Sequence, residues 1–267
     1  MDNAPFRDAF WYASLGMDAV LLARLVQLGL APHYRMLVAY LGFEILQGGA
    51  MVYVRASGMR LLGSHGYSLI YVATQPLVWL LYFLLILEFY SQMLEEFPGI
   101  RRLGRLTLFS ALTSVTLCCS SLILLDQRAG YDQYPFLSYL ALQQRSVFFC
   151  LSALSLLLLL FVAHYRLAVR RNVWVLYGCF GGYFLSAAVL YTFRRHLGSQ
   201  FAPLRDLGGP AFYVLALSAA ALSLSPAGES ESRPIGALWG SQDTNLEAAL
   251  SLQLQDLNHT LLKVLRS

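Results

Sequence analysis

Seven long apolar stretches fill the chain between about Trp11 and Ser225 and leave almost no length for a water-soluble domain. Only 13% of the 267 residues are charged and 57% are hydrophobic, whereas an ordinary soluble domain carries about 25% charged residues. Lipid satisfies no backbone polar group, so stretches of about 20 apolar residues are expected to cross it as helices. The sequence therefore predicts an all-α polytopic membrane protein, a bundle of seven transmembrane helices.

The membrane domain is predicted to occupy residues 1–225. Its seven spans are expected at about 8–30, 35–54, 67–94, 106–125, 137–165, 173–193 and 208–224. Residues 226–243 are expected to form a linker. A hydroxyl at Thr244 and a carboxylate at Glu247 then have the spacing of a helix capping box. Leucines recur afterwards at four- and three-residue steps, which is typical of an amphipathic helix, and a short one is predicted at 244–266.

The basic residues predict an orientation, because cytoplasmic loops keep an excess of arginine and lysine. One side of the membrane would hold ten basic residues: Arg35, Arg101, Arg102, Arg105, Arg166, Arg170, Arg171, Arg233, Lys263 and Arg266. The other side would hold seven: Arg7, Arg55, Arg60, Arg128, Arg194, Arg195 and Arg205. This asymmetry favours a multi-pass protein with its amino terminus outside and its carboxyl terminus in the cytoplasm.

Five ionisable residues lie inside the predicted spans, namely Asp18, Arg24, Glu44, Glu88 and Arg145. Each costs roughly 2.5 to 3.5 kcal/mol at the bilayer centre on insertion scales, so partners are expected. With a rise of about 1.5 Å per residue, Asp18, Glu44 and Arg145 lie about 12 to 15 Å from the ends of their helices and are predicted to meet near the midplane. Arg24 and Glu88 are predicted to form a second pair nearer the cytoplasm.

Polar and aromatic residues extend the first of these groups. Gln75, Trp79 and Tyr82 share one face of the third span, and Gln144 precedes Arg145. The predicted intramembrane polar or ligand-binding site comprises Asp18, Glu44, Gln75, Trp79, Tyr82, Gln144 and Arg145. Two interpretations stay open: the site binds an anionic ligand, conducts protons or switches the bundle, or its charges are only interhelical ties.

Other patterns limit the chemistry. Cys118, Cys119, Cys150 and Cys179 lie in apolar runs without the spacing of a zinc site, so neither a metal nor a cofactor is predicted. Lys263, the only lysine, lies in the tail, which excludes a retinal Schiff base in the last helix. Nucleotide-binding loops and hydrolase motifs are absent from the sequence, an enzyme is disfavoured, and the arginines at helix ends indicate topology, not nucleic-acid binding.

Small residues on the sixth span suggest how it packs. Gly178, Gly182 and Ser186 lie at four-residue steps, the spacing that permits close approach of two helices. Within a bundle of several helices, this pattern predicts a tight intramolecular contact.

Several short motifs resemble those of uncharacterised bacterial membrane proteins with seven transmembrane helices, a family with no known activity. The similar segments are Trp11-Tyr12, Phe43-Glu44, the run from Gln75 to Tyr82, Arg145-Ser146-Val147 and Arg171-Asn172-Val173. The likeness covers nearly the whole membrane region. It implies the architecture alone, with no known activity, ligand or catalytic residue. The location expected for the protein is a bacterial inner membrane.

Three functions are compatible with these features of the sequence. The first is a bacterial sensor or signalling component, in which the intramembrane polar site biases the bundle and the helix at 244–266 passes the change to a cytoplasmic partner or a second copy. The second is a small-solute or proton-coupled transporter that uses the same charges. The third is a membrane assembly or scaffold protein, in which those charges serve folding alone.

Overall fold

A computed structural model describes residues 4–56, 66–110, 113, 135–165, 167–197, 202–230, 232–234 and 244–264. The long helices are α1 (Ala4–Gln27), α2 (Arg35–Ala56), α3 (Gly66–Met93), α5 (Pro135–His164), α6 (Arg171–Leu197) and α7 (Ala202–Ser223). Residues 98–110 are also helical. A 3-10 turn, η2 (Pro226–Glu229), follows α7, and α8 spans Thr244–Val264.

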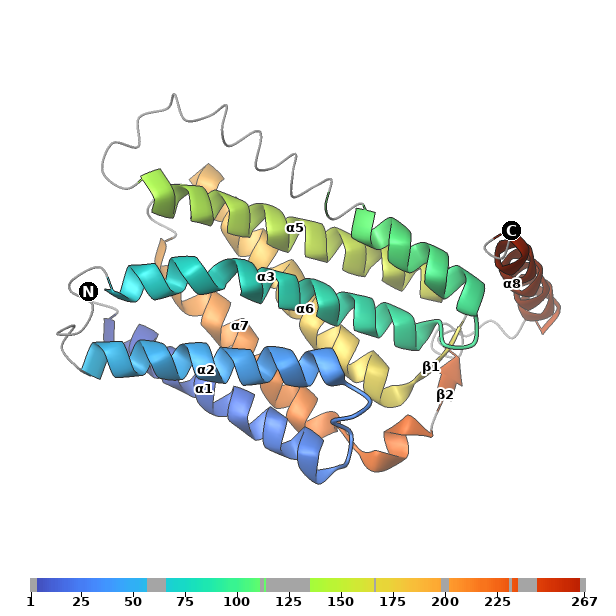
Figure 1. Cartoon of the computed structure of the whole chain (residues 1–267), viewed down its shortest axis with the longest axis horizontal. Coiled ribbons are helices and arrows are strands. Elements are labelled where there is room, and N and C mark those ends of the chain that lie inside the picture. Colours follow the sequence, from blue (N-terminus) through green and yellow to red (C-terminus); the bar gives the residue numbers. More distant parts are fainter. Residues whose placement is uncertain are drawn as a thin grey trace.

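The six long helices pack as a closed ring. In ring order, the contacts run from α1 to α2, α3, α5, α6, α7 and back to α1, and α3 also contacts α6 across the middle. The helices lie lengthwise beside one another, with the amino terminus at one end and α8 beyond the other (Figure 1). Fully buried aromatic side chains, including Tyr40, Phe89, Phe180 and Phe184, fill the interior of this ring.

Five of the described helices are long and apolar enough to cross a membrane. These candidate spans are Asp8–Gln27, Arg35–Val54, Ile70–Met93, Gln143–His164 and Arg171–Tyr191, and Leu207–Ser223 is a shorter apolar helix. The helical architecture is therefore confirmed and is compatible with a membrane protein. The predicted span at 106–125 lies largely outside the described residues, as does the linker from 235 onward, so a total of seven spans stays a prediction.

The link between α1 and α2 shows how the chain reverses at the end of the bundle that carries α8. Gly29 has φ +69°, a left-handed conformation that a glycine after a helix adopts without steric cost. The amide of Leu30 then donates to the carbonyl oxygen of Leu25 at 2.9 Å, which closes the helix end. The reversal makes α1 and α2 antiparallel neighbours, as the short link predicts.

A two-stranded sheet ties distant segments together at the same end. Strand β1 (Ala168–Arg170), between α5 and α6, pairs antiparallel with β2 (Ser232–Pro234), which follows α7. Val169 faces Arg233 in this register. Three residues are too few to show alternation, so the sequence predicts no strand here.

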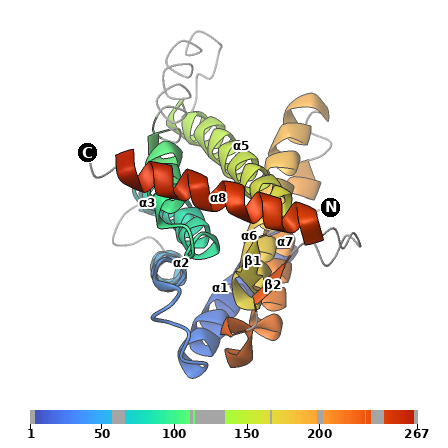
Figure 2. The same cartoon turned by 90° about the vertical axis from the view of Figure 1, so that its right-hand side faces the viewer.

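Helix α8 lies across this end of the bundle (Figure 2). Leu254 is buried, and Asn258 Oδ1 accepts the backbone amide of Gly99 at 2.7 Å. Leu257, one of the predicted apolar stripe, is instead 45% exposed. Leu254 and Leu261 of that stripe pack against the bundle, so the stripe meets the bundle in part, and Asn258 adds to the contact by satisfying a backbone donor.

The predicted close approach at Gly178 and Gly182 is wrong for the described part of the chain. A methyl group built at either position meets no atom within 4 Å. The glycine of α6 that does face a neighbour is Gly181, where such a methyl group would lie 3.7 Å from the Ser155 side chain on α5. The four-residue pattern therefore lies on the wrong face of α6.

Candidate functional site

A chain of polar contacts crosses the interior of the ring. Tyr213 on α7 donates a hydrogen bond to Asp18 Oδ1 on α1 at 2.6 Å. Tyr40 Oη on α2 lies 2.5 Å from Tyr213 Oη and 3.3 Å from Tyr82 Oη on α3. We call Asp18, Tyr213, Tyr40 and Tyr82 the tyrosine chain. It connects the first three helices, α1, α2 and α3, with α7.

The tyrosine chain is closed off from its surroundings. Asp18 is only 2% exposed, and the three tyrosines are also buried. The Tyr183 ring of α6 lies 5.0 Å from the Tyr213 ring and 6.3 Å from the Tyr82 ring, centroid to centroid. Burial of hydroxyl groups is tolerated here because each finds a hydrogen-bond partner within the chain.

Glu44 lies one helical turn after Tyr40 on α2 and interacts electrostatically with Asp18. The ion pairs among the described residues are those of Arg170 with Glu95 and Glu229, so neither Asp18 nor Glu44 has a cationic partner there. Two carboxylates thus share an apolar, aromatic surrounding without a basic side chain. Such intramembrane acids are costly, which makes them candidates for function.

The structure brings together only part of the predicted polar site. Asp18, Glu44 and Tyr82 belong to one cluster, but Arg145 forms no ion pair with either acid. The predicted pairing of Arg145 with Asp18 and Glu44 is therefore not seen among the described residues. Depth along a helix was the basis of that prediction, whereas the ring order separates α5 from α1 and α2 by intervening helices.

The remaining predicted residues lie between α3 and its neighbours. Gln144 accepts a hydrogen bond from Tyr71 at 3.3 Å, which ties α5 to α3. Gln75 is buried, and the Trp79 indole nitrogen is buried without a hydrogen-bond partner among the described residues. No contact of these three side chains with the tyrosine chain is seen in the described part of the molecule.

The second predicted pair, Arg24 with Glu88, is also not formed. Glu88 accepts the backbone amides of Met36 and Leu37 at 3.1 to 3.2 Å, and Arg24 donates to the carbonyl oxygen of Leu224 at 3.4 Å. The acid therefore satisfies free amides at the start of α2, and the base satisfies a carbonyl just beyond the end of α7. Helix ends bind opposite charges in this way.

A second polar cluster, which the sequence does not predict, lies at the end of the bundle near α8. Glu229 accepts hydrogen bonds from Tyr34 at 2.6 Å, from Asn172 Nδ2 at 3.0 Å and from Arg170 at 3.4 Å. Arg170 also pairs with Glu95. We call Tyr34, Arg170, Asn172 and Glu229 the end clasp. It joins the α1–α2 link, β1, α6 and η2.

Burial, together with the hydrogen-bonded Glu229 carboxylate, raises the pKa of Tyr34 well above its usual range. Tyr34 thus stays a hydroxyl donor at any physiological pH. The segment Arg171-Asn172-Val173 was noticed in the sequence as a motif, but its role depends on Glu229, 57 residues later. Sequence spacing alone carries no signal for such a contact.

No family model, no curated protein and no solved structure matches this chain. The fold and the buried polar cluster define a class only: a helical bundle with several apolar helices of membrane-spanning length and two carboxylates in its interior. Among the described residues there is no group of three or more side chains able to hold a metal ion.

Arg145 and Glu44, both in the described part of the chain, form no ion pair with each other, and this leads to a first prediction. In a double-mutant cycle of Arg145→Gln and Glu44→Gln, we expect a coupling below about 0.5 kcal/mol, since side chains without shared partners behave additively. The measurement is thermal unfolding of the four purified proteins in one detergent. As a positive control, Tyr213→Phe with Asp18→Asn should show coupling on the order of 1 kcal/mol. Strong coupling of Arg145 with Glu44 would contradict the arrangement of the ring.

Proposed function

We propose that this protein is an integral membrane sensor or signalling component in which the tyrosine chain and Glu44 form the responsive site. The observation that carries the proposal is the hydrogen-bonded path from Asp18 through Tyr213 and Tyr40 to Tyr82. A change in protonation, or the binding of a small cationic group at the two acids, would alter contacts among α1, α2, α3 and α7 together.

A connection toward the tail supports this proposal. Helices α1 and α7 carry Asp18 and Tyr213, and they continue to the contact between Arg24 and the Leu224 carbonyl. Ser225, the next residue, donates and accepts hydrogen bonds with Asn172 of the end clasp. The polypeptide then continues through β2 to α8, which we propose as the output helix. We propose a cytoplasmic location for α8, an outside amino terminus and a bacterial inner membrane.

The test is the accessibility of α8 when the distant site is altered. A single reporter, Leu257→Cys, would be labelled with a membrane-impermeant maleimide in a background lacking the natural cysteines. We expect Asp18→Asn and Tyr213→Phe to change the labelling rate severalfold, because α1 and α7 shift at the end clasp. Tyr53→Phe, a change at an exposed tyrosine of α2, is the matched control.

The outcome against a sensor is equally clear. If both variants stay folded and α8 reacts as in the unaltered protein, the tyrosine chain does not communicate with the tail. Any binding of the 244–266 helix to a second copy or a cytoplasmic partner would then be independent of the tyrosine chain.

A transporter is the second candidate, favoured by the two acids without a cationic partner. Hydroxyl and carboxyl groups in contact form a route along which protons pass in membrane proteins. Proton or solute flux in proteoliposomes that disappears in Glu44→Gln, but not in Tyr53→Phe, would favour this function. An assembly or scaffold protein would show neither flux nor altered labelling, only altered stability.

A further inference from the structure

The helical segment 98–110 carries basic and apolar side chains on one outward face. Arg102, Arg105, Leu106 and Phe109 are all exposed, and Leu106 and Phe109 are 66% and 54% exposed. At about 100° per residue, these four positions fall within a sector of about 100°. We call them the arginine face. Its charges come first along the helix, and its apolar side chains follow about one turn later.

The opposite side of the same segment fixes it to the bundle. Tyr90 donates a hydrogen bond to the carbonyl oxygen of Ile100 at 3.0 Å, and Ile100 is buried. Leu108 also packs against the core. The arginine face is therefore turned away from the protein, on a helix whose orientation is set by α3.

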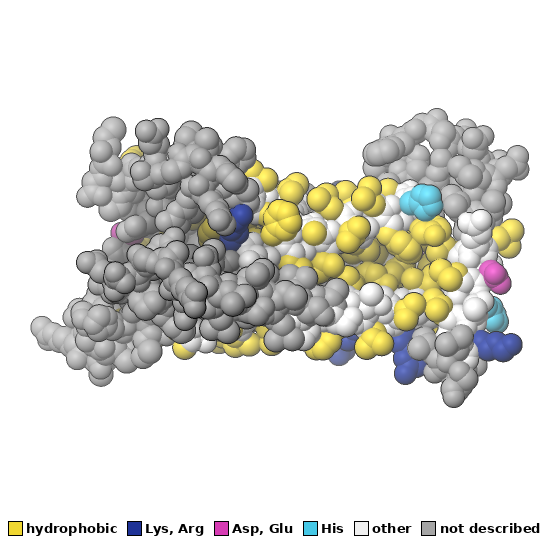
Figure 3. All heavy atoms as spheres, turned by 90° about the horizontal axis from the view of Figure 1, so that it is seen from above, with side chains coloured by type: hydrophobic (Ala, Val, Ile, Leu, Met, Phe, Trp, Pro, Cys, Tyr) yellow, Lys and Arg dark blue, Asp and Glu magenta, His cyan; other side chains and the backbone are white. Residues whose placement is uncertain are grey.

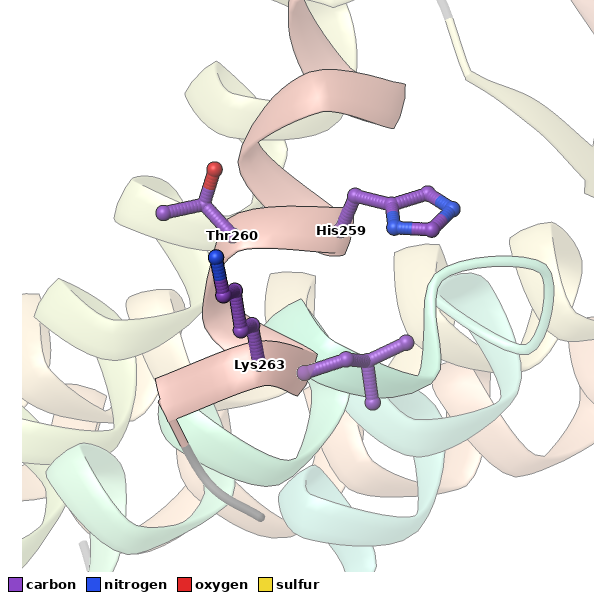
Figure 4. A pocket seen from close by; sticks show the side chains of 4 residues that line it. His259, Thr260 and Lys263 are labelled. Atoms are coloured by element: carbon purple, nitrogen blue, oxygen red, sulfur yellow. The ribbon is translucent and has the colours of Figure 1, made fainter. Parts of the chain in front are cut away.

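Helix α8 adds a further basic group near the start of this segment. Gly99 contacts Asn258 and lies close to the Leu262 side chain. His259, Thr260, Leu262 and Lys263 line a hollow of about 520 Å³ on α8 (Figure 4). In Figure 3 the middle of the upper face is apolar, and basic side chains gather toward the end where α8 lies.

Three cations of this region form no ion pair within the described part of the chain. These cations are Arg102, Arg105 and Lys263. Exposed acids do lie close in sequence, Glu96 before the segment and Asp256 on α8. The arginine face itself holds no carboxylate, so its charge is available to an external anion.

We propose that the arginine face binds an anionic phospholipid of the bilayer, independently of the tyrosine chain. Arg102 and Arg105 would contact the phosphate of the headgroup, since guanidinium groups bind phosphate oxygens in pairs. Leu106 and Phe109 would lie against the acyl chains. A free anion would make no contact with these exposed apolar side chains. A phospholipid has a charged headgroup followed by apolar chains, which matches the order of charged and apolar side chains along the helix. Lys263 supplies an additional cation at the headgroup level.

The experiment uses the full protein in nanodiscs that contain equal amounts of phosphatidylglycerol and phosphatidylcholine. After transfer to mild detergent, native mass spectrometry counts the lipids that remain bound. We expect phosphatidylglycerol to be retained over phosphatidylcholine. Arg102→Gln with Arg105→Gln should weaken its retention about 25-fold, because each basic residue near the membrane surface contributes about a factor of five. High salt should have the same effect.

Two matched variants separate a defined site from general surface charge. Arg102→Lys with Arg105→Lys keeps the charge but loses the paired guanidinium contacts, so it should retain less lipid than the unaltered protein and more than the glutamine pair. Arg35→Gln with Arg171→Gln removes two exposed arginines from the first residues of α2 and α6. Because these arginines lie outside the arginine face, retention should stay within about twofold. All three pairs change exposed positions and should leave thermal unfolding unaltered.

Three results would overturn the proposal. The first is equal retention of the two lipids by the unaltered protein. The second is an equal loss in the Arg35 and Arg171 pair. The third is complete displacement of phosphatidylglycerol by millimolar inorganic phosphate, which would indicate a site for a free anion.

Discussion

Replacing Asn172 by alanine should destabilise the protein by about 3 to 5 kcal/mol. Its side chain is fully buried and makes three hydrogen bonds: it donates to the Ser225 carbonyl at 2.7 Å and to Glu229 at 3.0 Å, and it accepts the Ser225 amide at 3.3 Å. Alanine would leave these groups without a partner in a site closed to water. An unsatisfied buried polar group costs about 1 to 3 kcal/mol.

The fit around Asn172 leaves no space for another group to take its place. A methyl group at Gly228 would come within 2.2 Å of Asn172 Oδ1, so η2 is pressed against this side chain. The loss should therefore extend to the whole end clasp, including the bonds of Glu229 with Tyr34 and Arg170. We expect the β1–β2 pairing to become exposed to hydrogen exchange in the variant.

The measurement is reversible unfolding in mixed detergent micelles, with amide exchange at β1 as the local readout. Asn258→Ala is the matched control, because that side chain accepts one hydrogen bond, from Gly99, at a partly exposed position. It should cost about 1 kcal/mol. Equal effects of the two changes would mean that the end clasp contributes little to stability.

Gly104→Val should be the second strongly disruptive change, with a loss above about 2 kcal/mol. A β-carbon at Gly104 would lie within van der Waals overlap of Tyr90, 1.7 Å from Oη and 2.4 Å from Cζ. Tyr90 is itself buried and hydrogen-bonded to Ile100, so the ring has no free space to enter. Either the tyrosine or the segment 98–110 must move away.

A double mutant identifies the cause. In a Tyr90→Ala background the overlap is absent, so Gly104→Val should cost far less there than in the unaltered protein. Gly182→Val on α6 is the control for the helix propensity of valine, because a β-carbon at that position meets no atom within 4 Å. If Gly182→Val is as disruptive as Gly104→Val, the contact with Tyr90 is not the reason. Unfolding in the same micelles, and protease sensitivity of segment 98–110, are the readouts.

The tyrosine chain shows how far sequence reasoning reached into the site. Asp18, Glu44 and Tyr82 were selected because polar residues in apolar spans are costly, and the structure places them in one cluster. Tyr213 and Tyr40 were missed, although Tyr213 is the hydrogen-bond partner of Asp18. A tyrosine is common in apolar helices, so its presence in a span does not mark a site. It joins the site only if it lies on the face of its helix that points into the ring.

The ion pairs illustrate the opposite error. The rise per residue gives the depth of each side chain along its helix. Equal depths suggested that Arg145 lies beside Asp18 and Arg24 beside Glu88. Both pairings required knowledge of which helices are neighbours. Arg24 and Glu88 instead bind the backbone of α7 and α2, a use of charge that spacing within one segment does not reveal.

By itself, the sequence determined the helical class, the apolar segments that form α1, α2, α3, α5, α6 and α7, and the identity of the costly acids, because apolar length and backbone hydrogen bonding are local properties. Only the tertiary structure decided the ring order, the tyrosine chain and the end clasp. These depend on contacts between residues up to 200 positions apart. Such contacts are selected by the packing of the whole bundle, since each helix has several faces of similar apolar character and the sequence does not state which face meets which neighbour.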